Sequence, residues 1–232
     1  ARAYDGGEFY GLSPTTALCR LDAADTGYMT SLNDKMAETI TEVVAGAGPD
    51  VVLDLPADTR AYVAYTLGRE GDERAGPALR ALVGDSDDLV SWAVVRAFHS
   101  LPALAPLDEF DLDLRRHNRF LILYVKVAKQ AARDDDRARF DYALDGLLSL
   151  TTDDAWHVRT KAVVVLRYFQ NVPAVADRIE TLAESDPSRT VRRTAVYVRA
   201  KDDRGAAREL FERIRDEDEA PLVREAARKV VD

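Results

Sequence analysis

The sequence predicts an all-α protein, an α-solenoid of about six helical hairpins that follow one another in a curved superhelix. Three observations support this fold class. An Asp followed six positions later by an Arg recurs at near-regular intervals along the chain. The residues after each Arg follow a helical pattern, and the segments between these helices are amphipathic too, with almost no alternating strand pattern.

The period is set by an Asp at positions 54, 85, 113, 153, 186 and 218, which are separated by 31, 28, 40, 33 and 32 residues. Five copies keep the Arg: Arg60, Arg119, Arg159, Arg192 and Arg224. The second copy has Ser91 in its place. Repeats of 20 to 50 residues are typical of solenoids, in which each unit buries its apolar face against its neighbours.

Each Arg position opens a predicted helix, because the residue three places later is apolar in every copy and offsets of three and six share a helical face. Those residues are Val63, Val94, Ile122, Ala162, Ala195 and Ala227. The helices expected before them cover 30–46, 73–84, 137–150, 173–184 and 203–215, and the Pro-rich segment 100–110 replaces one. The sequence therefore predicts a single solenoid domain over 30–232, with 1–29 as an N-terminal cap or tail.

The composition indicates an acidic protein that does not cross a membrane. The chain is 47% hydrophobic and 31% charged, with a formal net charge of −9 and no apolar run of spanning length. Its single cysteine, Cys19, excludes an internal disulfide and a Cys-based zinc site and fits a reducing compartment. We therefore expect a cytoplasmic protein.

The run "TRAYVAYTLGREGDERAGPALRALVGDSDD" closely resembles HEAT repeats, particularly the short HEAT-like repeats of phycobilin lyases. The resemblance extends from about residue 30 to the end of the chain. It implies that the Asp and Arg residues form a ladder between successive repeats, so the five arginines would be structural. Proteins with such repeats have many unrelated functions, so the resemblance predicts the fold and not the activity.

If the second helix of each hairpin lines the concave surface, offsets +1, +5 and +8 from the Arg position point away from the core. These offsets carry mainly aromatic and basic residues, with Glu225 as their one carboxylate. The predicted partner-binding residues are Tyr65, Trp92, Arg96, His99, Tyr124, Arg167, Arg193 and Tyr197. This combination predicts a non-enzymatic scaffold that binds a peptide or protein segment in its groove. Packing of the aromatic residues between neighbouring helices is the alternative interpretation.

Catalytic residues, a metal site and a cofactor site are not predicted. The chain has no His-Glu pair, so the di-iron site of HEAT-repeat deoxyhypusine hydroxylases is absent, and Cys19 has no evident His partner. The alternative function is nucleic-acid binding, which includes the HEAT-like alkylpurine DNA glycosylases. Trp92, Trp156, Arg96 and Arg167 could supply the tryptophans and the arginine of such an enzyme, and 115–119 and 189–193 are basic runs. Apart from Glu225 in the last copy, no Asp or Glu lies at offsets +1, +5 and +8, and the net charge is unfavourable for DNA.

Overall fold

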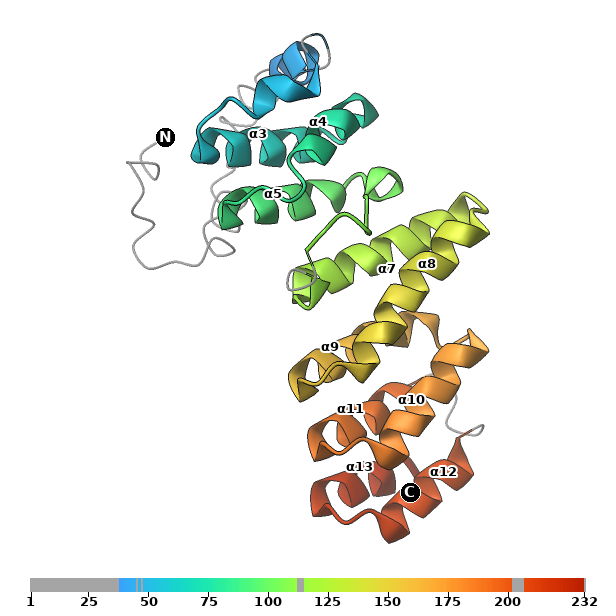
Figure 1. Cartoon of the computed structure of the whole chain (residues 1–232). Helices are drawn as coiled ribbons and strands as arrows, with labels where there is room; N and C mark the ends of the chain where they lie inside the picture. Colours follow the sequence, from blue (N-terminus) through green and yellow to red (C-terminus); the bar gives the residue numbers. More distant parts are fainter. Residues whose placement is uncertain (1–37, 45, 47, 112–114, 202–206, 232) are drawn as a thin grey trace, which may run out of the picture. The chain divides into compact units, whose positions relative to one another are not determined.

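The computed structural model describes residues 38–44, 46, 48–111, 115–201 and 207–231, and these residues form helices and turns without strands (Figure 1). The all-α prediction is confirmed for them. The predicted cap at 1–29, with Cys19, lies outside the described residues. The chain divides into two compact units, residues 1–112 and 113–232, and each is described by itself.

The first unit is built around two helices, α3 (Ala57–Glu70) and α5 (Asp88–Phe98), which pack along each other. Its other described elements are a helical segment at 38–44, the short helix α4 (Gly76–Ala81) and the 3-10 turns η1 (Pro49–Val52), η2 (Glu73–Ala75) and η3 (Pro102–Leu104). The segment at 50–55, too short for a strand by its sequence, is mostly the η1 turn. Helix α3 ends at Gly71, whose φ of 67° is the left-handed conformation that glycine adopts without strain.

Gly68 allows the two helices to approach closely. A Cβ on this residue would lie 2.2 Å from the Cα of Ala97 in α5, a distance at which backbone atoms must move. The sequence analysis placed Gly68 on the stripe that faces away from the core, and the structure corrects this, because Gly68 is buried at the contact between α3 and α5.

The second unit contains seven α-helices among its described residues. In chain order they are α7 (Asn118–Arg133), α8 (Arg137–Ser149), α9 (Trp156–Leu166), α10 (Pro173–Ser185), α11 (Arg189–Arg199), α12 (Arg208–Glu217) and α13 (Pro221–Val231). Two 3-10 turns, η4 (Leu150–Thr152) and η5 (Arg167–Phe169), flank α9.

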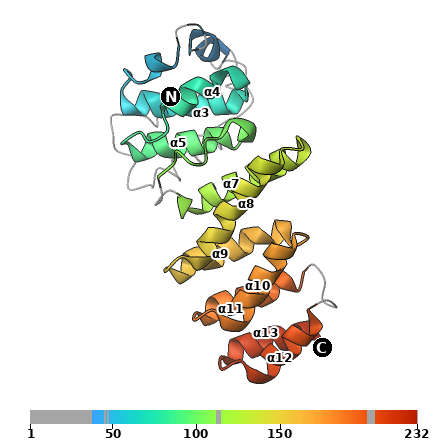
Figure 2. The same cartoon turned by 45° about the vertical axis from the view of Figure 1, so that its right-hand side comes forward.

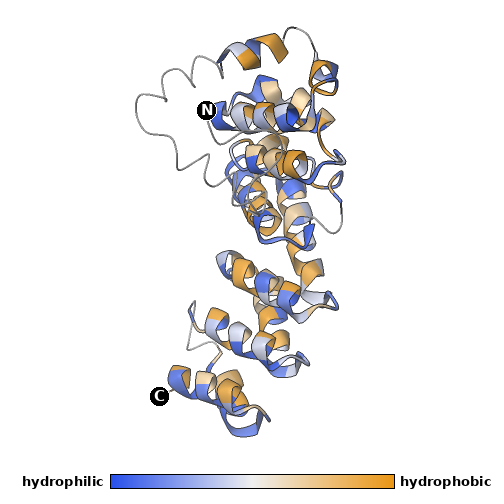
Figure 3. Cartoon of the chain, turned by 90° about the vertical axis from the view of Figure 1, so that its left-hand side faces the viewer, coloured by the Kyte–Doolittle hydropathy of each residue, from blue (hydrophilic) through white to orange (hydrophobic). Residues whose placement is uncertain are grey.

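The helices of the second unit form two rows (Figures 1 and 2). One row is α7, α9, α11 and α13, in which each helix contacts the next, and the other contains α8, α10 and α12. Hydrophobic and hydrophilic residues alternate around the helices, and the apolar sides are packed between the rows (Figure 3). Leu147 of α8, Val163 and Leu166 of α9 and Ile179 of α10 are fully buried there.

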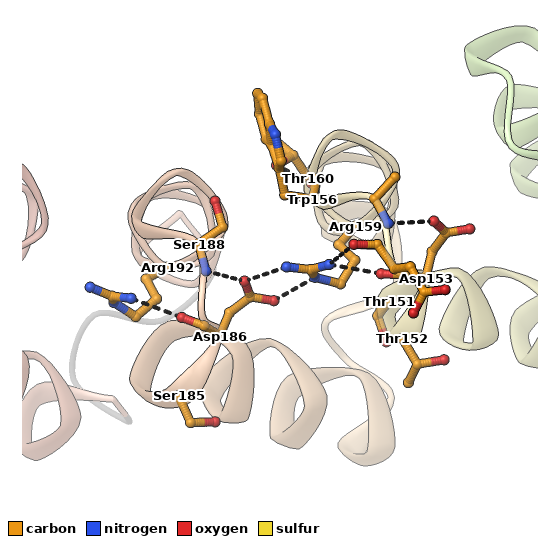
Figure 4. Close-up of polar contacts among 12 residues, drawn as sticks. Thr151, Thr152, Asp153, Trp156, Arg159, Thr160, Ser185, Asp186, Ser188 and Arg192 are labelled. Carbon is orange, nitrogen blue, oxygen red and sulfur yellow. Dashed lines mark hydrogen bonds and ion pairs between the residues drawn. The ribbon is translucent and has the colours of Figure 1, made fainter.

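An arginine at the start of α9 joins two successive helix pairs (Figure 4). Arg159 Nη1 donates to the backbone carbonyl of Asp153 at 2.7 Å, in the turn before α9. Its Nε and Nη2 donate to the two carboxylate oxygens of Asp186, in the turn before α11, at 2.8 and 2.9 Å. The ion pair is buried, with 10% of the Arg159 side chain and 2% of the Asp186 side chain exposed. One guanidinium therefore fixes its own turn and the next one together, which we call a rung.

The same arrangement occurs twice more among the described residues. Arg192 donates to the Asp186 carbonyl at 2.8 Å and to the Asp218 carboxylate at 2.8 and 3.1 Å. In the first unit, Arg60 donates to the Asp85 carboxylate at 2.7 and 3.0 Å, but its backbone acceptor is the carbonyl of Leu55, at 2.5 Å. The rungs that the resemblance implied for Arg60, Arg159 and Arg192 are thus present.

The remaining copies depart from the prediction in three ways. Arg116, and not Arg119, donates to the Asp153 carboxylate, at 2.7 Å from both Nε and Nη2. Arg116 precedes α7, because that helix begins only at Asn118. Ser91, which replaces an arginine, donates from Oγ to the Asp85 carbonyl at 3.0 Å and so keeps only the local half of a rung. Arg224 also makes the local half, to the Asp218 carbonyl at 2.6 Å.

Each rung carboxylate also orients the turn in which it lies. One oxygen accepts the backbone N–H two residues further on, as Asp153 does from Ala155 at 2.8 Å and Asp186 does from Ser188 at 2.8 Å. Asp153 and Asp186 lie before the N-cap positions of α9 and α11, which are Ala155 and Ser188. Asp87, in contrast, caps α5 and accepts from the backbone N–H groups of Leu89 and Val90. The hydrogen bond from Arg116 is the main reason that the pKa of Asp153 is lowered, with the Ala155 N–H contributing and burial opposing.

We predict that Arg192→Ala lowers the free energy of unfolding by about 3 kcal/mol or more, because it leaves the Asp218 carboxylate buried without its main partner. Urea denaturation followed by circular dichroism measures this loss. Arg189→Ala, an exposed position one turn earlier on α11, is the control and should change stability by less than about 0.5 kcal/mol. Equal effects of the two substitutions would contradict a structural role for the rung.

We predict that Gly68→Ala destabilises the protein, because the new Cβ collides with the backbone of Ala97. Thermal unfolding should show a lower midpoint, and Ala97→Gly in the same chain should recover part of the loss. Gly46→Ala is the control: it is also helical and has nothing within 4 Å of its added Cβ, so it should be neutral or stabilising by up to about 1 kcal/mol. An unchanged midpoint for Gly68→Ala would refute the close contact.

We predict that the contribution of Asp153 disappears at acidic pH. Its pKa is lowered in the folded protein, so its ionised form stabilises folding above the unfolded value of about 3.9. The contribution is lost as the pH falls from there through the lower folded value. The difference in unfolding free energy between wild type and Asp153→Asn should therefore be constant above about pH 5.5 and shrink below about pH 4.

Urea titrations across this range test the pH dependence. Asp154→Asn, which removes the exposed neighbouring carboxylate, should leave the wild-type pH profile intact. A difference between wild type and Asp153→Asn that persists undiminished at about pH 2.5 would show that the carboxylate charge does not stabilise the fold.

Candidate functional site

The eight predicted binding residues are divided between the two units. Tyr65, Trp92, Arg96 and His99 belong to the first unit, and Tyr124, Arg167, Arg193 and Tyr197 belong to the second. In the first unit, Tyr65, Trp92 and Arg96 are half-buried. In the second, Arg167, Arg193 and Tyr197 are exposed, as the stripe at offsets +1, +5 and +8 predicts.

The structure corrects the exposure expected for His99 and Tyr124. His99 is 8% exposed, because α5 ends at Phe98 and the backbone turns at His99, whose N–H donates to Arg96. Tyr124 is 3% exposed. Its ring packs against Gly146 of α8, where a Cβ would lie 2.4 Å from Cε1, and meets the edge of Phe120 with the centroids 5.1 Å apart.

The burial of Tyr124 follows from the register of α7. Counting from Arg119 places Phe120 and Tyr124 outside the core, but both are buried and the exposed residues are Ile122 and Lys129. The buried side of α7 is therefore rotated about the helix axis by about two residues, or about 200°, relative to the buried sides in the other copies. The shift accompanies the move of the rung arginine from Arg119 to Arg116. Counting from Arg116 would not have corrected the prediction, because Tyr124 then lies at offset +8, so its burial follows from the packing of α8 against α7.

Helix α9 carries an exposed stripe along its length. Trp156, Val164 and Tyr168 are 50%, 37% and 46% exposed, and Thr160 lies between them, so the four residues repeat every four positions. Figure 4 shows the Trp156 indole on the side of α9 that faces away from the rung. The stripe extends for about 18 Å. Offsets +1 and +5 from Arg159 predicted Thr160 and Val164, the middle of the stripe. Extending the same four-residue spacing by one turn at each end would have included Trp156 and Tyr168.

Tyr168 lies between two cations. Arg167 Nη2 donates to the phenol oxygen at 2.6 Å, and Lys129 Nζ lies 4.1 Å from the centroid of the ring. Because the Arg167 hydrogen bond stabilises the phenolate, the pKa of Tyr168 is lowered. The face of the ring is held by the cations, while nearly half of the side chain stays open to solvent.

Helix α11 carries a second stripe of exposed residues. It lies beside the stripe of α9, because α9 and α11 are neighbours in the same row. Arg189, Arg193 and Tyr197 are exposed at four-residue spacing, and the Arg193 guanidinium carbon lies 5.6 Å from the centroid of the Tyr197 ring. Since α9 and α11 contact each other and are backed by the second row, their exposed stripes lie on the same side. We call the combined surface the α9–α11 face; its residues are Trp156, Val164, Arg167, Tyr168, Arg193 and Tyr197.

The α9–α11 face can stack, bury apolar surface and attract negative charge. Exposed aromatic side chains paired with cations are well suited to contacts with another molecule. The one histidine beside it, His157, meets the Trp156 ring edge at a centroid distance of 5.9 Å. Among the described residues no group of three His, Cys, Asp or Glu side chains is arranged to hold a metal ion. Of the helices described, none combines the length and hydropathy needed to cross a membrane.

Comparison of the chain with protein-family models and with curated proteins found no match.

Proposed function

We propose that this protein is a non-enzymatic interaction scaffold that binds a peptide or protein segment on the α9–α11 face. The observation that carries the proposal is the exposure of three aromatic side chains, Trp156, Tyr168 and Tyr197, on two adjacent helices. Two of these rings are already held by neighbouring cations. Ordered aromatic and arginine side chains are the residues that dominate binding at protein interfaces.

The helix arrangement supports a HEAT-like α-solenoid as the scaffold. In the second unit each helix of a row contacts the next, and Arg159 and Arg192 link the turns of consecutive helix pairs. This is the inter-repeat ladder that the resemblance to HEAT repeats implies. Solenoids of this type bind partners along extended surfaces, so a stripe shared by neighbouring helices supports the proposal of a docking surface there.

Nucleic-acid binding is the second candidate, because α7, α9 and α11 contain no Asp or Glu. Exposed aromatic residues beside arginines also serve as stacking platforms for bases. A glycosylase would in addition need a catalytic carboxylate, and these three helices do not supply one. We therefore favour the binding of a protein segment.

The proposal predicts that Trp156→Ala combined with Tyr197→Ala abolishes peptide binding. A phage-displayed library of random peptides of about 16 residues, long enough in extended form to cross two helices, is selected on the wild-type protein. Peptides that bind should lose at least about tenfold in affinity on the double variant, measured by fluorescence anisotropy. The far-ultraviolet circular dichroism should remain that of the wild type.

Tyr142→Ala is the matched control, because Tyr142 is an aromatic residue of similar exposure on α8, in the other row. It should leave the affinity unchanged. The proposal fails if no peptide is enriched, or if the enriched peptides bind the double variant as well as they bind the wild type.

A further inference from the structure

Three neighbouring helices of the second unit differ from its other helices in charge. Helices α7, α9 and α11 contain no carboxylate, although the chain as a whole has a net charge of −9. The helices α8, α10, α12 and α13 carry residues of both signs, with acidic residues such as Asp145 on α8, Glu184 on α10 and Glu225 on α13. A partner at the α9–α11 face therefore meets positive charge on an otherwise acidic protein.

Several cations of these helices are already neutralised. Arg159 and Arg192 pair with the rung carboxylates, and Arg199 Nε donates to Glu180 at 2.7 Å. Four exposed cations differ from them, since no carboxylate of the described residues forms an ion pair with them: Lys129, Arg167, Arg189 and Arg193. Three of the four contact Tyr168 or Tyr197, which places the charge directly beside the exposed rings.

We propose that the partner of the α9–α11 face is an acidic peptide segment, one that carries Asp or Glu side chains next to apolar or aromatic ones. This inference rests on the proposed function and adds the chemistry of the partner. Carboxylates would pair with Arg167, Arg189 and Arg193. Apolar side chains of the peptide would cover Trp156 and Val164, because contact with a charged group does not bury their apolar surface favourably.

Charge complementarity favours an acidic peptide over a nucleic acid. The four cations come from α7, η5 and α11, and Arg167 and Arg193 are held against tyrosine rings, an arrangement that suits single carboxylates better than the regular phosphates of a backbone. Exposed carboxylates such as Asp154 lie in the turn before α9. A long polyanion would pass these carboxylates, whereas a short acidic segment need not.

The first test is the composition of the selected peptides. Peptides that bind wild type and fail on the Trp156→Ala and Tyr197→Ala variant should be enriched in Asp and Glu over the unselected library. If such peptides are neutral or basic, the inference is wrong while the proposed function stands. If no peptide depends on these two residues, the proposed function itself is wrong, and the inference falls with it.

The second test reverses the charge of the face. Arg167→Glu combined with Arg193→Glu should weaken the binding of a selected acidic peptide by at least about tenfold in fluorescence anisotropy at about 100 mM salt. The matched control is Arg137→Glu combined with Arg208→Glu, which makes the same change in net charge on the opposite row. Both control positions are the first residues of their helices, α8 and α12, where a carboxylate is favoured by the helix dipole.

The control should keep the wild-type affinity within about twofold. Equal losses in both double variants would show a response to net charge alone and overturn the inference. An oligothymidylate of about 20 nucleotides is titrated in parallel at about 50 mM salt. Binding of this probe that is tighter than that of the peptide, and that is lost in the Arg167→Glu and Arg193→Glu variant, would overturn the acidic peptide in favour of a nucleic acid.

Discussion

The guanidinium that faces two turns at once is the contact on which the second unit depends. Arg159 binds the backbone of its own turn and the carboxylate of the next, and Arg192 repeats the pattern from the turn where the first contact ends. Asp186 thus belongs to both: its carboxylate accepts from Arg159 and its carbonyl from Arg192. A buried ion pair adds little net stability compared with apolar packing, but it tolerates few geometries. Its main effect is to determine how neighbouring helix pairs align.

The alignment has a direct consequence for the exposed side of the row. The Arg159–Asp186 pair links the start of α9 to the turn before α11 (Figure 4), so residues at equal offsets on the two helices are expected to lie side by side. The arginine of each rung lies on one side of its helix, and the exposed stripe of the α9–α11 face lies on another side of the same helix. The ion pairs and the candidate binding surface therefore lie on different sides of the helices, so the exposed residues can differ from one helix of the row to the next. They do differ, with tryptophan and tyrosine on α9 and arginine and tyrosine on α11.

Much of this arrangement could be predicted from the sequence. The Asp and Arg spacing located α9 and α11 within a few residues, and it identified Arg159 and Arg192 as partners of the next repeat. The offsets from these arginines placed Arg167, Arg193 and Tyr197 outside the core. The prediction works here because both helices begin at the same distance from their rung, so position along the chain determines the direction of each side chain.

The prediction fails where a helix begins elsewhere. Arg116 supplies the rung of α7 from before the helix, and Phe120 and Tyr124 are turned into the core, against Gly146. Arg119, and not Arg116, has the six-residue spacing from Asp113, so the pattern could not identify Arg116 as the partner of Asp153. The same is true of Gly68, whose small size is visible in the sequence but whose contact with Ala97 is not.

The sequence by itself determined that the chain is helical, where most of its helices lie and which arginines link them, because these properties follow from local periodicity and from a repeated pair of charges. Only the tertiary structure decided which sides of the helices remain exposed. It brought Lys129 of α7 onto the ring of Tyr168 after α9, residues far apart in sequence. It also placed the exposed aromatic and basic residues of α9, η5 and α11 next to one another, on helices that contain no Asp or Glu. The exposure of a side chain depends on which other elements pack against its helix, and the sequence of that helix alone does not specify them.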